Sequence, residues 1–149
     1  MRLLTTSSSL ERAFEQSLTQ HTRVSFAVAW SSHDFPGCDE LIRHEDKIDQ
    51  GVVGIHFYQT HPSFIEHFLH DDRVKFMKNS SGVFHPKIYV FETSPKDWTC
   101  LIGSANFTAA AFSTNSEACL LIEAKDDPSG ATTRKLDSTL ARLLASENL

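Results

Sequence analysis

Two apolar runs, residues 24–30 and 51–58, constrain the fold of this chain most strongly. Each is short, mostly apolar and rich in residues that favour strands, which is typical of a strand buried on both faces. Helical patterns flank the first run. Ser8 and Glu11 fit a capping box ahead of apolar residues at helical spacing, which predicts a helix over about residues 9–21. Strands that alternate with helices favour an α/β fold, a mixed β-sheet sandwiched between helices.

The rest of the chain extends this pattern. Further helices are predicted from Pro36 to about residue 47, over about ten residues around 64–69, and briefly after Asn106. A terminal helix is predicted from Asp127-Pro128 onward, with an apolar stripe of Leu136, Leu140, Leu143 and Leu144. Further strands are predicted over residues 73–76, 85–92, 98–102 and 117–122. No linker or internal repeat interrupts the 149 residues, so we expect one domain over residues 1–149.

The net charge of the chain is −5, from 14 Lys and Arg against 19 Asp and Glu. This balance argues against a protein that coats nucleic acid over its whole surface, because such domains usually have an isoelectric point above about 9. A local basic site remains possible. Residues 73–91 contain Arg73, Lys75, Lys78 and Lys87 and no acidic residue. We therefore expect this stretch to supply any binding site for phosphate groups.

Several features of the sequence bear on the cellular compartment of the protein. No apolar run approaches the roughly 18–20 residues that cross a bilayer, and the N-terminal residues lack the apolar region of a signal peptide. The three cysteines are an odd number with no Cys-x-x-Cys spacing, which favours free thiols in a reducing compartment. We therefore expect a cytoplasmic protein without a membrane partner.

His85 and Lys87 open the chemically informative part of the chain. They stand two residues apart in a predicted strand, so their side chains should share one face. Residues 103–106, Gly-Ser-Ala-Asn, follow the next strand, where a turn of small residues exposes backbone N–H groups to an anion. Glu117 opens the strand after that. A histidine nucleophile, a lysine and an amide on phosphate oxygens, and a carboxylate that fixes the imidazole tautomer suit phosphoryl transfer without a metal.

These motifs resemble the signature of the phospholipase D superfamily, which is His-x-Lys, four residues, Asp, and Gly-Ser-x-Asn further along. The match is carried by residues 84–91 and 103–108, with residues 115–117 similar to the downstream glutamate segment and residues 29–32 similar to the opening strand. The resemblance therefore covers nearly the whole chain. It is greatest to the nuclease branch, which includes restriction endonucleases and nuclease-like domains fused to helicases.

The resemblance implies a role for each matching residue. His85 would attack phosphorus and form a phosphohistidine, while Lys87, Asn106 and Ser104 would hold the phosphate oxygens and Glu117 would orient a histidine. Family enzymes join two His-x-Lys motifs in one active site, and this chain has one. The resemblance thus implies a homodimer in which the two His85 residues face each other across a two-fold axis. It implies no metal and no other cofactor.

Two positions depart from the family pattern. Glu92 stands where the family usually has Asp, and the gap to Gly103 is a few residues longer. That aspartate is generally interpreted as structural, so we expect Glu92 to be structural and the added residues to lengthen a hairpin. Gly103 and the basic residues Arg73, Lys75 and Lys78 are predicted to bind substrate.

The substrate is predicted to be nucleic acid, DNA or RNA, which makes the chain a metal-independent endonuclease. Two alternatives stay open: a phospholipase D-like lipid hydrolase or phosphatidyltransferase, and an inactive module that binds nucleic acid or assembles with a larger system. The sequence does not distinguish DNA from RNA, single from double strands, or one biological pathway from another.

Other residues allow competing interpretations. His67 and His70, next to Asp71 and Asp72, could hold a metal, but no third ligand follows at a recognisable interval, which favours a solvated helix end. The aromatic residues are interpreted as core or dimer packing rather than a surface that stacks on bases, namely Phe76, Phe84, Phe91, Phe107, Phe112, Trp30 and Trp98.

Overall fold

The computed structural model describes residues 1–79 and 81–145 of the chain. Its helices are α1 (Ser7–Gln20), α2 (Pro36–Arg43), α3 (Pro62–Phe68) and α4 (Ala131–Leu144). Its strands are β1 (Arg2–Leu4), β2 (Arg23–Val28), β3 (Ile48–Gly54), β4 (Val74–Met77), β5 (Lys87–Ser94), β6 (Asp97–Gly103) and β7 (Cys119–Glu123). Short 3-10 turns lie at Glu45–Lys47, His56–Tyr58 and Ala124–Asp126.

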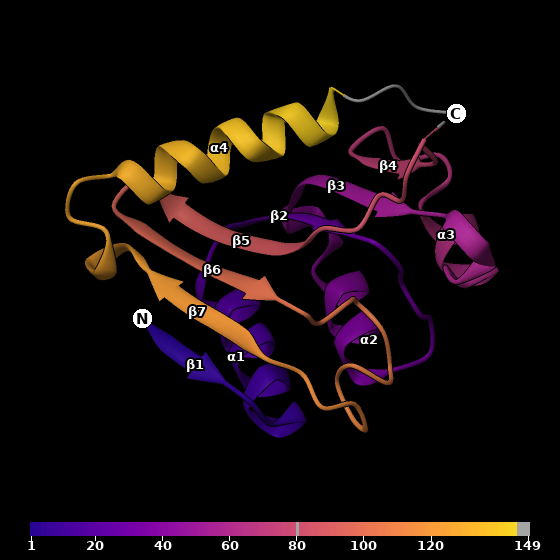
Figure 1. Cartoon of the computed structure of the whole chain (residues 1–149), viewed down its shortest axis with the longest axis horizontal. Coiled ribbons are helices and arrows are strands. Elements are labelled where there is room, and N and C mark those ends of the chain that lie inside the picture. The colour runs from indigo at the N-terminus through magenta and orange to yellow at the C-terminus, as the bar shows by residue number, and fades with distance from the viewer. Residues whose placement is uncertain (80, 146–149) are drawn as a thin grey trace.

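All these strands form one seven-stranded sheet in the order β1-β7-β6-β5-β2-β3-β4. β2, β3 and β4 run parallel to each other, whereas β5 is antiparallel to both β2 and β6, and β7 is antiparallel to β6 and β1. Val28 at the end of β2 therefore lies opposite Lys87 at the start of β5. We call this end of the sheet, on the right of Figure 1, the Lys87 end.

Helices cover both faces of the sheet, as the sequence predicts (Figure 1). On the first face, the ring of Phe14 from α1 lies 5.5 Å from that of Phe91 and 5.8 Å from that of Tyr89, and it also contacts Phe107 and Phe112. Phe64 and Phe68 of α3 belong to the same core cluster. On the opposite face, Leu136 and Leu140 of α4 are buried against the strands. The predicted mixed sheet between helices is confirmed.

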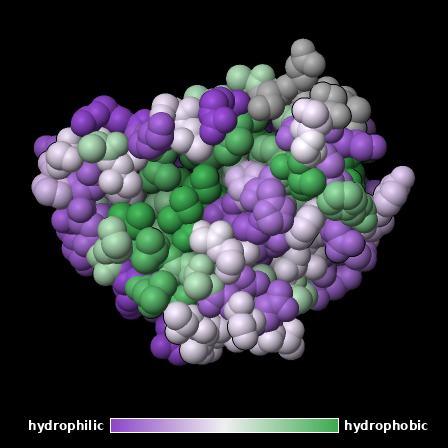
Figure 2. Space-filling model, viewed as in Figure 1, coloured by the Kyte–Doolittle hydropathy of each residue, from purple (hydrophilic) through white to green (hydrophobic). Residues whose placement is uncertain are grey.

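The face that α4 crosses is only partly covered. Below α4 in Figure 2, a continuous hydrophobic area lies over β5, β6 and β7. Ile102 and Leu120 contribute to it as partly buried residues, and Leu3 of β1 is 62% exposed. α4 is a single helix and leaves the strands at this edge of the sheet without a covering layer.

Several predicted boundaries at the N-terminal half are wrong. The capping box of α1 consists of Thr6 and Ser9, because the Thr6 hydroxyl accepts from the Ser9 backbone N–H at 3.2 Å; Ser8 and Glu11 do not form it. The strand expected over residues 51–58 ends at Gly54. It gives way to the 3-10 turn His56–Tyr58, so the apolar and aromatic composition alone misplaced its end.

The C-terminal half holds further corrections. The short helix expected directly after Asn106 does not form; residues 109–114 form successive turns instead, with Phe112 N–H bonded to the Thr108 carbonyl oxygen. β7 begins at Cys119, after Glu117. α4 begins at Ala131, and Asp127 acts from outside the helix by accepting from the Thr133 backbone N–H at 2.9 Å. Within the described part of the chain, no helix is long and apolar enough to cross a membrane.

Candidate active site

The site begins at Lys87, the first residue of β5. Lys87 is 9% exposed, and its Nζ lies 2.9 Å from His85 Nδ1 and donates to the His85 backbone oxygen at 3.1 Å. Because an ammonium group can only donate, Nδ1 accepts, and a neutral imidazole then carries its proton on Nε2. His85 and Pro86 precede the strand, so the expected shared strand face is corrected. The two groups meet because the Lys87 side chain reaches back along the chain.

Trp30 forms a wall beside this pair. Its ring lies edge-on to the His85 ring at a centroid distance of 5.1 Å, and Lys87 Nζ lies 5.7 Å from the Trp30 ring centroid. The second contact is within the range of a cation–π interaction. Sequence reasoning interpreted Trp30 as ordinary packing and missed this position. The available signal was its place directly after β2, at the sheet end where the His-x-Lys motif begins.

Ser104 and Glu117 are joined on the other side of the site. The Ser104 hydroxyl donates to Glu117 Oε2, and the Asn115 side-chain amide donates to Glu117 Oε1 at 3.1 Å. Ser104 Oγ in turn accepts from the Ala118 backbone N–H at 2.9 Å. The structure therefore brings two predicted site residues together and fixes the Glu117 carboxylate before any substrate binds. Neither oxygen of this carboxylate is hydrogen-bonded to His85 among the described contacts.

Gly103 has a packing requirement of its own. A Cβ atom at this position would lie 2.3 Å from the Ala118 backbone oxygen and 2.6 Å from the Cys119 Cα atom. Both are backbone atoms, which cannot move aside as a flexible side chain can. The close approach of β6 to the start of β7 therefore needs a glycine here.

Asn106 stands in a turn that is anchored on two sides. The buried Tyr89 hydroxyl donates to the Ala105 backbone oxygen at 3.1 Å, and the Ser32 N–H donates to the Phe107 backbone oxygen at 2.9 Å. Asn106 Oδ1 is buried and has no hydrogen-bond partner among the described residues. Buried polar atoms are normally paired, so this unpaired amide oxygen is an exception to the usual pattern.

Burial and charge set the protonation of the central pair. Burial lowers the pKa of Lys87, and the negative charge of Glu117 opposes that shift. Burial and the nearby Lys87 ammonium both lower the pKa of His85. The imidazole is therefore neutral at neutral pH, as a nucleophile must be. Lys87 remains the positive charge at the site.

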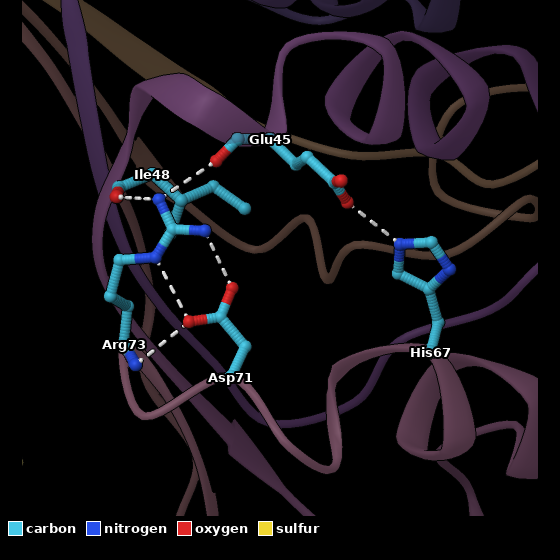
Figure 3. Close-up of polar contacts among 5 residues, drawn as sticks. All are labelled: Glu45, Ile48, His67, Asp71 and Arg73. Carbon is cyan, nitrogen blue, oxygen red and sulfur yellow. Dashed lines mark hydrogen bonds and ion pairs between the residues drawn. The ribbon is translucent and has the colours of Figure 1, made fainter.

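Arg73 is not brought to this site. It precedes β4, at the end of the sheet opposite Lys87, and its guanidinium makes two bonds to Asp71, at 2.9 and 2.7 Å (Figure 3). The same group donates to the backbone oxygens of Glu45 and Ile48 at 3.1 and 3.0 Å. These bonds tie the start of β4 to the start of β3 and occupy the donors that a substrate phosphate would need.

The other predicted residues lie at different positions along the strands. Lys78 is exposed and directly follows β4 at the Lys87 end, whereas Lys75 lies within β4 opposite Val52. Glu92 lies near the far end of β5, where it forms an ion pair of 3.0 Å with Arg23. The structure thus gives Glu92 a contact away from the site, and its structural role stays a prediction.

Among the described residues, the structure shows no further ligands for a metal site at His67 and His70. His67 Nε2 lies 2.9 Å from Glu45 Oε2, which makes an ion pair when the histidine is protonated (Figure 3). In the part of the chain that the structure describes, no group of three or more His, Cys, Asp or Glu residues could hold a metal ion.

Comparison with known sequences identifies one family. Residues 46–144 match the family described as cardiolipin synthase, PLD-like domain. This match includes β3 to β7, both halves of the motif pair and all of α4. No curated protein sequence matches the chain significantly.

Solved structures share the fold. NucT from Helicobacter pylori is similar with a TM-score of 0.69 and 17% identity, over 97% of this chain and 95% of that chain. Nuc from Salmonella typhimurium, described as a phospholipase D family member, is similar with a TM-score of 0.64 and 17% identity, over 95% of this chain and 90% of that chain. Phosphatidylserine synthase from Haemophilus influenzae gives 0.64 and 13%, over 99% and 39% of the two chains.

Proposed function

Since the chain belongs to the phospholipase D-like domain family, we propose that it is a nuclease that hydrolyses phosphodiester bonds of DNA or RNA at the His85–Lys87 site. One observation carries this proposal. A buried ammonium group lies 2.9 Å from the imidazole that would attack phosphorus, so a phosphate bound to Lys87 is placed against His85. Lys87 would thus both position the phosphate for attack and stabilise its negative charge.

The reaction proceeds in two displacements. The incoming phosphate competes for Lys87 Nζ, which frees His85 Nδ1 to carry the ring proton and leaves the Nε2 lone pair available. Nε2 attacks phosphorus, so that a phosphorus–nitrogen bond forms as the bond to the leaving oxygen breaks. Water then attacks the phosphohistidine and releases His85. Each step needs an acid or a base in addition to the nucleophile.

A second copy of the chain supplies that acid and base. One His-x-Lys motif is present per chain, so we propose a homodimer in which His85 of the partner subunit protonates the leaving oxygen and later takes a proton from water. In this proposal Glu117, which is fixed by Ser104 and Asn115, orients an imidazole across the two-fold axis. The Lys87 ends of the two chains then face one substrate.

Lys87, Asn106 and the Ser104 turn stabilise the charge that develops on the phosphate oxygens. The side-chain amide of Asn106 and the backbone N–H groups of the turn offer neutral donors beside the Lys87 cation. Loss of one such donor typically lowers the rate about 10²–10³-fold. No metal ion takes part in these steps as we propose them.

The experiment is a cleavage assay with EDTA on single- and double-stranded DNA and RNA. We expect wild-type protein to cleave at least one of these substrates and to form an acid-labile phosphoprotein. We expect His85→Ala to abolish both signals, and the matched control His70→Ala, at an exposed histidine outside the site, to retain them. Activity that needs an added metal would contradict the mechanism.

Phosphatidyl transfer is a second candidate. It is favoured by the family description and by the structural similarity to a phosphatidylserine synthase. The same purified protein should be given phosphatidyl substrates in detergent micelles. Release of a headgroup with no cleavage of any nucleic acid would support this candidate over the nuclease.

A further inference from the structure

Two exposed aromatic rings stand on the connection between β3 and α3. Phe57 is 64% exposed and Tyr58 is 98% exposed. They are adjacent, whereas Phe84, Phe91 and Phe107 are buried in the core. A pair of large exposed apolar surfaces indicates an interaction site when it lies beside a functional centre.

The backbone holds these rings in an uncommon conformation. Phe57 has a φ of 59° and Tyr58 a φ of 55°, in the left-handed region that residues other than glycine rarely adopt. Bonds on either side hold the connection in place: Ile55 N–H donates to the Met77 backbone oxygen at 3.0 Å, and His61 N–H donates to the Ser31 backbone oxygen at 2.8 Å. Such strain persists where surrounding structure enforces it, and it concentrates at functional sites.

His56 lies at the base of the same turn. It is 8% exposed, its ring centroid lies 6.0 Å from that of Phe57, and neither ring nitrogen has a hydrogen-bond partner among the described residues. Buried polar atoms are normally paired. The turn therefore carries unused hydrogen-bonding capacity directly beside its exposed rings, which suits a ligand with both a flat face and polar edges.

The turn belongs to the Lys87 end of the sheet. It follows β3, which is separated from β5 by β2 alone, so its root lies roughly 10 Å from the start of β5 at the usual strand spacing. The bond from His61 to Ser31 links it to the residue after Trp30, the wall of the His85 site. Lys78, exposed beyond Met77, adds a positive charge next to Ile55.

We propose that Phe57 and Tyr58 form a stacking platform for the unpaired bases of a single-stranded nucleic acid. With one phosphate at Lys87, a neighbouring base covers the platform and a further phosphate meets Lys78. Every base has a flat face, so the platform favours single strands without reading their sequence. In a duplex the bases are stacked on each other and do not reach it. This inference rests on the proposed nuclease function and names the form of its substrate.

The test measures binding separately from cleavage. All proteins carry His85→Ala, which prevents turnover, and anisotropy is measured at one fixed low salt concentration. The probes are a labelled single strand, a duplex of the same length and an abasic strand of the same length. The variants are Phe57→Ala/Tyr58→Ala, Phe57→Trp/Tyr58→Trp and the control Leu69→Ala, whose exposed side chain (59%) lies after α3.

We expect Phe57→Ala/Tyr58→Ala to weaken binding of the single strand about 10-fold or more, with less than about a twofold change for the duplex and abasic strand, which offer no stackable base. The tryptophan variant should retain affinity, and its fluorescence should be quenched by the single strand alone. Leu69→Ala should bind all probes as the parent does. Circular dichroism verifies that each variant is folded.

Three results would overturn the platform. They are equal single-strand affinity with and without the rings, an equal loss for all three probes, and loss of the dimer in sedimentation, which would make the rings a subunit contact. Failure of the nuclease function itself is distinguishable. In that case the wild-type protein cleaves nothing, while the anisotropy measurement still tests whether binding of single strands depends on the two rings.

Discussion

At the scale of single residues, Lys87 governs the state of its neighbour His85. The ammonium group is buried, contacts His85 Nδ1 at 2.9 Å and lies beside the Trp30 ring. A positive charge so close disfavours a second one, and it therefore keeps the imidazole unprotonated. In the proposed mechanism, the histidine becomes free to attack when a phosphate binds Lys87.

This coupling predicts the acid limb of the pH–rate profile. The pKa of His85 is lowered by burial and by Lys87, so the neutral, nucleophilic form persists to a lower pH than in an exposed histidine. Activity should accordingly fall on acidification only below the ordinary histidine range around pH 6.5. Lys87→Met should raise the pKa of His85 and lower the rate about 10²–10³-fold.

An NMR titration of His85 and the rate profile of the wild type check this prediction, with His70 as the internal reference for an exposed imidazole. A His85 pKa that does not move in Lys87→Met would show that the two groups are not coupled in solution.

At the scale of elements, the sheet and its covering helices could be predicted, while several element ends could not. Val24 to Val28 fall in a continuous apolar run and form β2, because burial on both faces selects such residues. Residues 56–58 continue a similar composition, yet Phe57 and Tyr58 have a positive φ, which no hydrophobic pattern encodes. β1, with three residues, is too short to show any period.

The same limit applies to the candidate site. The proximity of His85 to Lys87 was predictable from their spacing, whereas the bond from Ser104 to Glu117 was not predicted. Arg73 was misjudged because charge in a sequence does not reveal its partners, and Asp71 stands two residues away. Trp30 was missed because an aromatic residue after a strand is usually part of a core.

The close approach of β6 to β7 predicts the effect of Gly103→Ala. The added Cβ would lie 2.3 Å from the Ala118 backbone oxygen, so the strands must separate and the Ser104–Glu117 contact must loosen. We expect a loss of unfolding free energy of about 1–3 kcal/mol, as for other overpacked positions, together with reduced activity. Urea unfolding measures the first. Unchanged stability would mean that the β6–β7 junction tolerates a side chain.

At the scale of the whole molecule, one chain holds one set of site residues on a surface of net charge −5. Lys78 and Lys87 lie at the same end of the sheet, so the positive charge is local rather than general. Two such ends facing each other would concentrate it around one substrate and leave the remaining surface acidic. This favours salt-sensitive binding in a single groove.

A shared site predicts how mixtures behave. When wild-type and His85→Ala chains are unfolded together in equal amounts and refolded, random pairing makes half of the dimers mixed. If each site needs both histidines, activity should fall to about a quarter of that of the undiluted wild type, instead of about a half for independent chains. Sedimentation of the mixture verifies that dimers form. A linear fall in activity with the wild-type fraction would contradict the shared site.

The pairing of β2 with β5 has a consequence for how the chain acquires its site. Val28 and Lys87 are neighbours in the sheet but far apart along the chain, because β3, β4, α2 and α3 lie between them in sequence. Contacts of such long range form slowly, because the loop they close must first lose its conformational freedom. A nascent or partly refolded chain can therefore hold its helices and its β5–β6 hairpin and still lack the Trp30 wall. We therefore expect activity to appear only after β2 and β5 have paired.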